Sequence, residues 1–270
     1  MKTLILFLAT LMVLVAGALT VLASPTYKLS AARPSPSPLF VIGNPPPTPS
    51  PTPAPTATPA PVVTPSGTVT FSVPVYKQLR NLDCETAALQ MALGALGINY
   101  TQNQLIAMQP PPDTRQPVMG TVNGHKAVLQ WGNPYKNFVG NIDGADLIPT
   151  GYGIYYPPLL ALVQSHGVPN AAGGEGWTAA KIYAELAAGH PVMAWTETGW
   201  DRPYVGYWTT FDEKIKIRYS LIEHVVTLSG VSATQVRVND PWHSGSQYWF
   251  SKAEFERSWA DFNNMAIVFK

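Results

Sequence analysis

The sequence predicts an α+β domain over residues 68–270, with a helical N-terminal half packed on a C-terminal antiparallel sheet. The stretch that begins at Cys84 carries apolar residues at helical spacing and ends at Gly97, a typical C-terminal cap. Later segments at 224–231 and 235–240 have the pattern of two strands joined by a short turn. Helices followed by antiparallel strands are typical of α+β domains, and about 200 residues are enough for one sizeable core.

The remaining elements have their own start and stop signals. We expect, in chain order, a strand at 68–73 stopped by Pro74, a helix with a capping box at Thr101 and Gln104, a helix at 158–164, a helix from Thr178 to Gly189, strands at 192–196 and 214–219, a helix with a capping box at Ser251 and Glu254, and a strand at 265–269. Residues 109–157 show no dominant period, so an irregular insertion that shapes a cleft is expected there.

The N-terminus is typical of an export segment followed by a spacer. Lys2 precedes an uncharged apolar run from Leu4 to Ala23, which suits either a cleaved signal peptide or an uncleaved membrane anchor. Both alternatives place the rest of the chain outside the cytoplasm, secreted or anchored to the cell surface. Residues 24–67 are rich in Pro, Ser and Thr, which predicts an extended linker with no core of its own.

Charge excludes one class of partner. The chain has 17 basic and 16 acidic side chains, so no excess of charge favours nucleic acid. The sequence has no paired cysteines for zinc and no glycine-rich phosphate loop, so we expect neither a metal nor a cofactor. We expect a monomer that contacts a membrane only through its N-terminal segment.

Cys84 is the only cysteine of the chain, and it opens a predicted helix. A lone thiol in an exported protein forms no internal disulfide, so it is either a buried structural residue or a reactive one. Backbone N–H groups and the helix dipole at a helix N-terminus stabilise a thiolate. We therefore expect the pKa of Cys84 to lie below its reference value of about 8.5.

The predicted hairpin brings a base and a carboxylate together. If the midpoint of this hairpin lies near Ser232, His224 and Asp240 face each other across the two strands. Asp240 would then orient the imidazole toward a thiol, and Gln78, six residues before Cys84, would supply an amide for an oxyanion. The alternatives are a structural strand histidine, and an Asp-Pro turn at Asp240 and Pro241. A metal site of Asp240, His243 and Glu223 has no ligand motif to support it.

Four segments together resemble a known family. They are 73–78 (VPVYKQ), 83–88 (DCETAA), 224–226 (HVV) and 239–241 (NDP), and they are similar to the C39-like bacterial cysteine peptidases of the papain-like superfamily. The resemblance implies a papain-like fold and a peptide or protein substrate. It also implies Cys84 as nucleophile, His224 as base, Asp240 as the group that orients it and Gln78 as oxyanion donor.

The chain departs from the family pattern after the cysteine, where Glu85 and Thr86 replace the Gly-Pro of many members. We expect Glu85 to favour the helix N-terminus. Two other functions remain open. One is a non-catalytic surface module that presents tryptophans to cell-wall polymer or peptide, and the other is an amidase of cell-wall peptides. The tryptophans of the first alternative are Trp131, Trp177, Trp200, Trp208, Trp242 and Trp249.

Overall fold

The computed structural model describes residues 67–242 and 244–270. The predicted signal peptide or anchor at 1–23 and the linker, except for Gly67, lie outside the described residues. Among the residues that are described, no helix is long and apolar enough to cross a membrane. The described residues thus correspond to the domain that the sequence predicts over 68–270.

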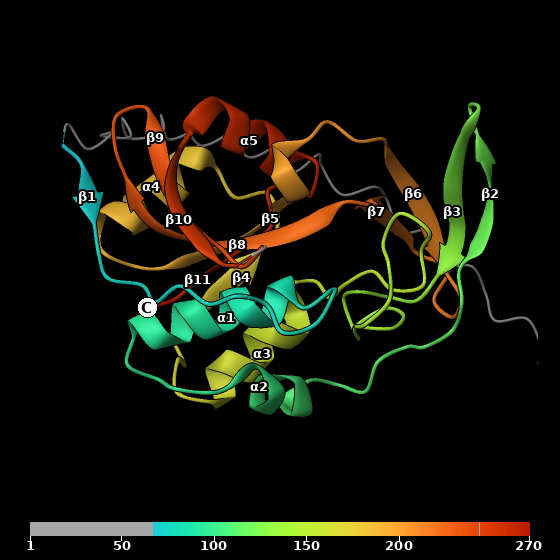
Figure 1. Cartoon of the computed structure of the whole chain (residues 1–270), viewed down its shortest axis with the longest axis horizontal. Coiled ribbons are helices and arrows are strands. Elements are labelled where there is room, and N and C mark those ends of the chain that lie inside the picture. Colours follow the sequence, from blue (N-terminus) through green and yellow to red (C-terminus); the bar gives the residue numbers. More distant parts are fainter. Residues whose placement is uncertain (1–66, 243) are drawn as a thin grey trace, which may run out of the picture. The chain divides into compact units, whose positions relative to one another are not determined.

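Among the described residues, most α-helices lie in the first half of the domain and most strands in the second half (Figure 1). The helices are α1 (Cys84–Ala95), α2 (Gln102–Met108), α3 (Tyr156–Ser165), α4 (Ala179–Ala187) and α5 (Lys252–Ala260), with a short 3-10 helix, η1, at Thr198–Trp200. The strands are β1 (Val69–Thr70), β2 (Val118–Val122), β3 (His125–Trp131), β4 (Ala172–Gly174), β5 (Val192–Glu197), β6 (Val205–Thr210), β7 (Lys216–Ser220), β8 (Glu223–Val231), β9 (Gln235–Asp240), β10 (Ser246–Ser251) and β11 (Ala266–Val268).

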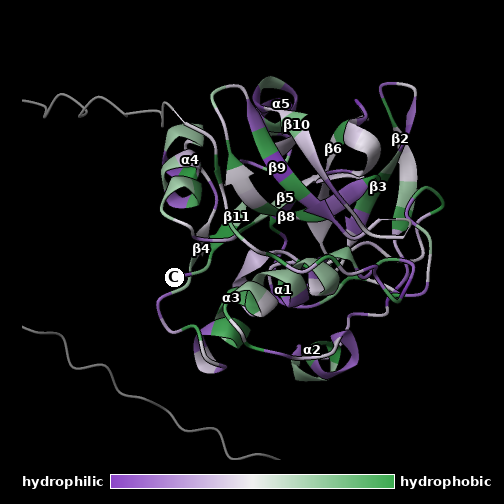
Figure 2. Cartoon of the chain, turned by 60° about the vertical axis from the view of Figure 1, so that its left-hand side comes forward, coloured by the Kyte–Doolittle hydropathy of each residue, from purple (hydrophilic) through white to green (hydrophobic). Residues whose placement is uncertain are grey.

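A seven-stranded antiparallel sheet forms the centre of the domain. Its order is β10-β9-β8-β5-β11-β4, with β1 paired to β8 at Val69 and Thr70. Helices α1, α2 and α3 lie on one side of this sheet, and α4 and α5 lie on the other (Figures 1 and 2). The α+β class with an antiparallel sheet is therefore as predicted, although helices cover both faces.

The side chains of β8 point alternately to the two faces of the central sheet, which explains why helices pack on both faces. Val225 belongs to the core on the α1 side, and Thr227 Oγ1 donates a 2.7 Å hydrogen bond to the carbonyl oxygen of Ala88 in α1. Val226 and Leu228 belong to the core that includes α4 and α5. Since successive strand residues point to opposite faces, a strand buried on both faces is apolar along its whole length. This packing fixes α1 across the middle of the sheet.

The predicted irregular insertion at 109–157 contains a β-hairpin that the sequence analysis missed. Strands β2 and β3 are joined at Asn123 and Gly124, both with positive φ, and they form a second sheet of order β2-β3-β6-β7. The Asn-Gly pair is the signal that favours such a turn. The flanking strand β2 has no fully buried residue, so it lacks the alternation that would have identified it.

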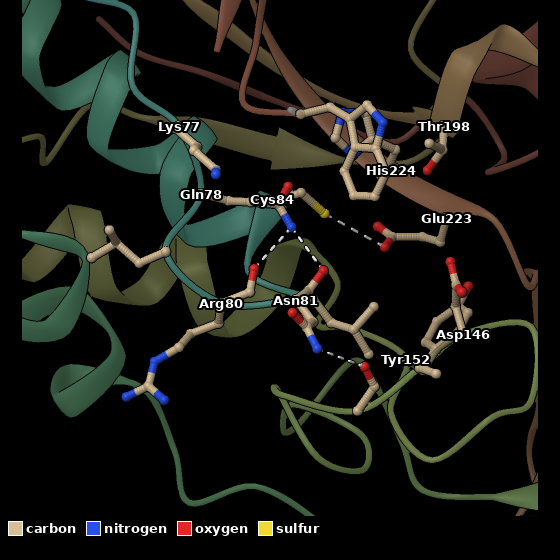
Figure 3. Close-up of a pocket in the computed structure, with 15 residues that line it drawn as sticks. Lys77, Gln78, Arg80, Asn81, Cys84, Asp146, Tyr152, Thr198, Glu223 and His224 are labelled. Carbon is tan, nitrogen blue, oxygen red and sulfur yellow. Dashed lines mark hydrogen bonds between the residues drawn. The ribbon is translucent and has the colours of Figure 1, made fainter. Parts of the chain in front are cut away.

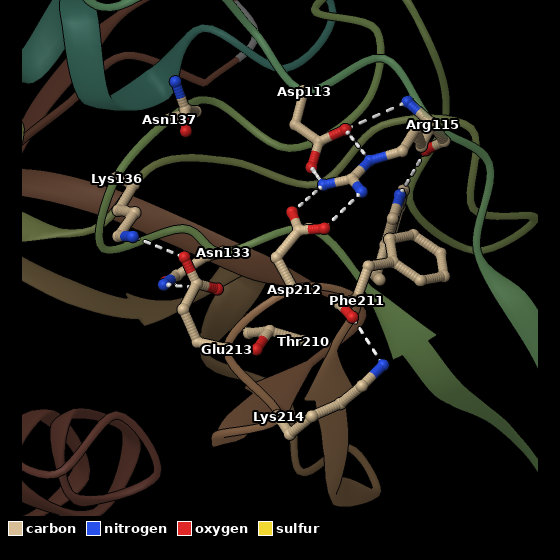
Figure 4. Close-up of polar contacts among 12 residues, drawn as sticks. Asp113, Arg115, Asn133, Lys136, Asn137, Thr210, Phe211, Asp212, Glu213 and Lys214 are labelled. Atoms are coloured by element: carbon tan, nitrogen blue, oxygen red, sulfur yellow. Dashed lines mark hydrogen bonds and ion pairs between the residues drawn. The ribbon is translucent and has the colours of Figure 1, made fainter. Parts of the chain in front are cut away.

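Arg115 joins the segment before β2 to the turn between β6 and β7 (Figure 4). Its guanidinium lies 2.6 Å from a carboxylate oxygen of Asp113 and 2.6 Å from one of Asp212. Lys136 pairs with Glu213 in the same turn. Exposed ion pairs contribute little to stability, so this network mainly fixes the position of the second sheet.

The helix-start predictions have mixed outcomes. The capping box of Thr101 and Gln104 is present at α2, and Thr178 accepts from the Lys181 N–H at α4. Helix α5 follows Ser251 as predicted, but the Ser251 side chain makes no capping hydrogen bond. The pattern of Ser251 and Glu254 therefore located the start of α5 correctly, although Ser251 does not form the expected capping hydrogen bond.

Candidate active site

A cleft of about 440 Å³ opens where α1 and β8 begin (Figure 3). Its walls come from the loop before α1, the loop at 144–146 and the first residues of β8. Three of the four predicted site residues line it, namely Gln78, Cys84 and His224. The fourth, Asp240, contacts His224 from the end of β9. Strand pairing thus gathers residues that lie far apart in the chain.

Cys84 is the first residue of α1, and only 4% of it is exposed. Its thiol donates toward two carboxyl groups, with Sγ 3.4 Å from Glu85 Oε2 and 3.9 Å from Glu223 Oε2. Among the described residues, no hydrogen bond joins this thiol to His224. The thiol therefore lies at the base of the cleft, and its hydrogen-bond partners are acids rather than the expected imidazole.

The pKa of Cys84 shifts opposite to the sequence prediction. Burial raises the pKa of the thiol well above 9.0, and the charges of Glu85 and Glu223 raise it further. A hydrogen bond with the Val225 backbone lowers it, by less. The position at a helix N-terminus is as predicted, but desolvation and two nearby carboxyls outweigh the dipole.

Glu85 and Glu223 form a buried acid pair beside the thiol. Glu85 Oε1 accepts a 2.6 Å hydrogen bond from the Ile154 N–H, while burial raises its pKa to about 8. Burial and the charge of Glu85 raise the pKa of Glu223 well above 4.5, and Glu223 Oε1 has no hydrogen-bond partner. Glu85 lies in the first turn of α1 as expected, but its side chain also contacts the thiol and the Ile154 N–H. The adjacency of Glu223 to His224 was the only sequence signal for the pair.

We expect this environment to appear in the reactivity of Cys84. The rate of its alkylation by iodoacetamide should keep rising beyond pH 9, because the thiolate is disfavoured until then. Glu85→Gln removes a charge that raises the thiol pKa, so the midpoint of its alkylation rate against pH should lie at a lower pH than that of the wild type. The measurement is the alkylation rate against pH for both proteins, with Cys84 as the only reactive thiol. A wild-type midpoint below 8.5 would contradict this account.

His224 and Asp240 form the predicted pair. His224 Nε2 lies 2.8 Å from Asp240 Oδ1, and both side chains are mostly buried. In the register of the hairpin, Thr227 pairs with Asn239, so the two residues are diagonal rather than directly opposite. The offset arises because the hairpin turns between Ala233 and Thr234, later than Ser232, and the register shift between Leu228 and Gly230 reduces it by one residue. The contact was predicted correctly, and the direct facing position was not.

Asp240 is held by two further donors that the sequence analysis did not identify. The Trp242 N–H donates to Oδ1 and the Tyr248 hydroxyl donates to Oδ2, each at 2.8 Å. Burial alone raises the pKa of Asp240, but the hydrogen bond and charge of His224, with these donors, lower it to about 2. The carboxylate is therefore ionised at neutral pH. Since it occupies Nε2, the nitrogen left without a partner among the described residues is Nδ1.

Gln78 lies in the cleft with its amide group already engaged. Its Nε2 donates to the carbonyl oxygens of Arg80, at 3.0 Å, and Asn81, at 2.8 Å, and its Oε1 is buried without a partner. The Gln78 N–H donates to the Pro241 carbonyl at 3.0 Å, which ties this loop to the Asp240 end of β9. The structure thus places Gln78 as predicted, but both amide hydrogens close its own loop (Figure 3).

The remaining sequence alternatives fit the structure less well. Trp131 and Trp208 are 0% and 1% exposed, so they cannot line a binding surface, whereas Trp242 lines the cleft. In the considered metal site, His243 lies outside the described residues and Asp240 is bound to His224. Two of the six tryptophans of the alternative surface module, Trp131 and Trp208, are therefore core residues.

A family model and a solved structure point to the same family. The model of the Peptidase_C39 like family matches residues 70–267. A crystal structure of a candidate C39-like peptidase from Bacillus anthracis is 26% identical, with a TM-score of 0.62, and the match covers 75% of this chain and 97% of that one. A double glycine motif protease from an AMS/PCAT transporter, solved with a leader peptide, is 17% identical with a TM-score of 0.39, covering 74% and 93%. Among curated proteins, none matches.

Proposed function

Because the chain belongs to the Peptidase_C39 like family, we propose that it hydrolyses peptide bonds by acyl transfer through Cys84. The observation that carries this proposal is the placement of Cys84 and the His224–Asp240 pair at one cleft. A nucleophile, a base and a group that orients the base are the parts that this chemistry requires. No step of the proposed reaction needs a metal or cofactor.

In the proposed reaction His224 acts as a general base on a neutral thiol. The raised pKa of Cys84 disfavours a preformed thiolate, so the proton passes from Sγ to Nδ1 as sulfur attacks the carbonyl carbon. The imidazolium then gives this proton to the leaving amine as the C–N bond breaks. Water attacks the thioester with His224 again as base, which releases the acid and restores the thiol. Asp240, ionised and fixed by Tyr248, holds the imidazole through Nε2.

Gln78 is the proposed oxyanion donor, but its side-chain amide already donates to two backbone carbonyl groups. To donate to the oxyanion, Nε2 must exchange at least one of its two backbone carbonyl partners for substrate oxygen. A donor that strengthens only as charge develops contributes to the transition state rather than to substrate binding. The Cys84 backbone N–H at the helix N-terminus is the second proposed donor.

Gln78→Ala should lower turnover about 100-fold with little change in substrate binding. The variant lacks one hydrogen-bond donor to the negative charge that forms on the substrate carbonyl oxygen only while sulfur attacks. Single-turnover acylation and melting temperature, measured together, check it. Gln102→Ala is the matched control, because Gln102 also bonds this loop, through the Leu79 N–H and the Lys77 carbonyl, but does not line the cleft. Equal losses in both variants would assign Gln78 a purely structural role.

The setting of this activity is also a proposal. We infer that the chain acts outside the cytoplasm as a monomer, secreted or held at the surface by residues 1–23, with the linker as a spacer. Its substrate is a peptide or protein, and cell-wall peptide is the runner-up. The test is a fluorogenic peptide library incubated with the protein and with Cys84→Ala. Cleavage by the wild type alone supports the proposal, and equal rates for both proteins would exclude it.

A further inference from the structure

We propose that Cys84, Glu85 and Glu223 form a binding site for a divalent transition-metal ion of the Zn²⁺ type. The site shares Cys84 with the proposed peptide chemistry, but metal binding does not require that the protein be an enzyme. Only its consequence, a blocked nucleophile, rests on the proposed function. The inference starts from three donor atoms that lie within 4.8 Å of one another, two of which, from Cys84 and Glu223, are seen at the cleft in Figure 3.

The spacing of the donors fits a small tetrahedral ion. Sγ of Cys84 lies 3.4 Å from Glu85 Oε2 and 3.9 Å from Glu223 Oε2, and one ligand atom from each residue lies within 4.8 Å of the others. Tetrahedral Zn²⁺, with bonds of about 2.3 Å to sulfur and about 2.1 Å to oxygen, places neighbouring sulfur and oxygen ligands about 3.6 Å apart. Small side-chain movements therefore bring all three atoms to bonding distance.

Glu223 supplies an independent observation that points to a bound ion, namely a buried carboxyl oxygen without a hydrogen-bond partner. It comes from β8, on the opposite wall of the cleft from α1, and is 8% exposed. Its Oε1 has no hydrogen-bond partner, although buried carboxyl oxygens ordinarily have one. Its carboxyl group points toward Cys84 rather than toward solvent (Figure 3). An ion bound by both carboxyl oxygens of Glu223 would reach the thiol through Oε2 and give Oε1 the partner that it lacks.

The backbone at Gly153 lies close to both carboxyl groups, where a side chain would collide with them. A Cβ atom added at Gly153 would lie 2.4 Å from Glu85 Oε1 and 3.1 Å from Glu223 Oε2. The Ile154 N–H also holds Glu85 Oε1, which leaves Oε2 directed at the thiol. Gly153 and Ile154 thus form a backbone cradle that positions both carboxyl groups beside sulfur.

The donor set selects the type of ion. Mg²⁺ and Ca²⁺ prefer shells of oxygen ligands, whereas thiolate together with carboxylate suits Zn²⁺ and related ions. Three protein ligands leave a fourth position, open to the cleft, for water. Binding breaks the S–H bond and the O–H bond of each carboxyl group that holds a proton, and releases these protons to solvent as the sulfur–metal and oxygen–metal bonds form. The sulfur electron pair is then no longer available for attack.

The first test uses the full-length chain and needs no substrate. Co²⁺ serves as a spectroscopic probe, because a thiolate ligand gives a sulfur-to-metal charge-transfer band that only Cys84 can produce. We expect this band to appear with a single binding step, and Zn²⁺ to displace Co²⁺ and abolish it. Zn²⁺ should also slow alkylation of Cys84 at least tenfold, while an equal concentration of Mg²⁺ should not.

Variants separate this site from simple binding to a thiol. Glu85→Gln and Glu223→Gln keep the shape of each side chain but remove a ligand, and each should weaken Zn²⁺ binding at least tenfold. Glu254→Gln is the charge-matched control in α5, where Glu254 contacts Arg202 and Arg257, and it should bind as the wild type does. If a variant fails to fold, the Co²⁺ band and alkylation of the wild type still decide the question.

Two results would overturn the proposal. One is a wild-type chain that gives no charge-transfer band and no slowing of alkylation in excess Zn²⁺. The other is unchanged affinity in both glutamine variants, which would leave the thiol as the only ligand of the three. A chain that binds Zn²⁺ as expected but cleaves no peptide would support the metal site and contradict the proposed function, so the two conclusions fail separately.

Discussion

His224→Ala should lower the rate of peptide hydrolysis by about 100- to 10,000-fold, the range that a general base contributes. The effect is large because the Cys84 thiol is held in its neutral form by burial and neighbouring acids, so attack depends on a base that removes its proton. Nδ1 of His224 is the ring nitrogen left for that task, since Nε2 is bound to Asp240. Pre-steady-state acylation on a cleaved peptide measures the loss directly.

The matched control for this prediction is His125→Ala. His125 lies in β3, stacked on Tyr204 and outside the residues that line the cleft, so its replacement should leave the rate unchanged. Combining His224→Ala with Cys84→Ala should cost little more than the larger single loss, because the two residues act as one unit. A folded His224→Ala protein with wild-type activity would contradict the assignment of the base.

Asp240→Asn should reduce both catalysis and acid-dependent stability. Its carboxylate orients His224 and stabilises the imidazolium, so the rate should fall, but by less than in His224→Ala, which removes the base itself. The pKa of Asp240 is lowered from 3.8 to about 2. A depressed carboxyl pKa contributes stability above the unfolded value, and that stability is lost as pH falls from about 4 toward 2. The shift corresponds to about 2 kcal/mol at neutral pH.

Urea unfolding at pH 7 and at pH 3 tests the stability part. The difference in unfolding free energy between the wild type and Asp240→Asn should be larger at pH 7 than at pH 3. At pH 3 the Asp240 carboxyl of the unfolded wild-type chain, with a pKa of 3.8, is mostly protonated, while that of the folded chain, with a pKa of about 2, is mostly ionised. Asp261→Asn is a comparison at a carboxylate that pairs with Arg218. A difference that does not change with pH would show that the His224–Asp240 contact has no electrostatic contribution to folding.

The sequence predicted the parts of the site that depend on local signals. Cys84 at a helix start and the hairpin that carries His224 and Asp240 follow from residue spacing, and both are present in the structure. The thiol environment does not follow from such signals, because Glu223 reaches Cys84 only after β8 packs beside α1. A pKa that depends on burial is likewise a property of packing.

The fold shows the same division. Apolar strands such as β5 and β8 were visible because burial on both faces gives continuous apolar runs. The β2–β3 hairpin was missed because its exposed strand has no such run, although Asn123 and Gly124 mark its turn. Tyr248 was missed because its role depends on the pairing of β10 with β9, which brings its hydroxyl to Asp240.

The position of β11 in the central sheet has a consequence for how the protein matures during synthesis. Strand β11, at Ala266–Val268, pairs with both β5 and β4, so the sheet has a gap until these residues have left the ribosome. Cys84 is made long before His224, and the central sheet to which His224 belongs is completed only by this late strand. A chain interrupted anywhere before residue 266 would therefore leave the facing edges of β5 and β4 without the strand that pairs with both.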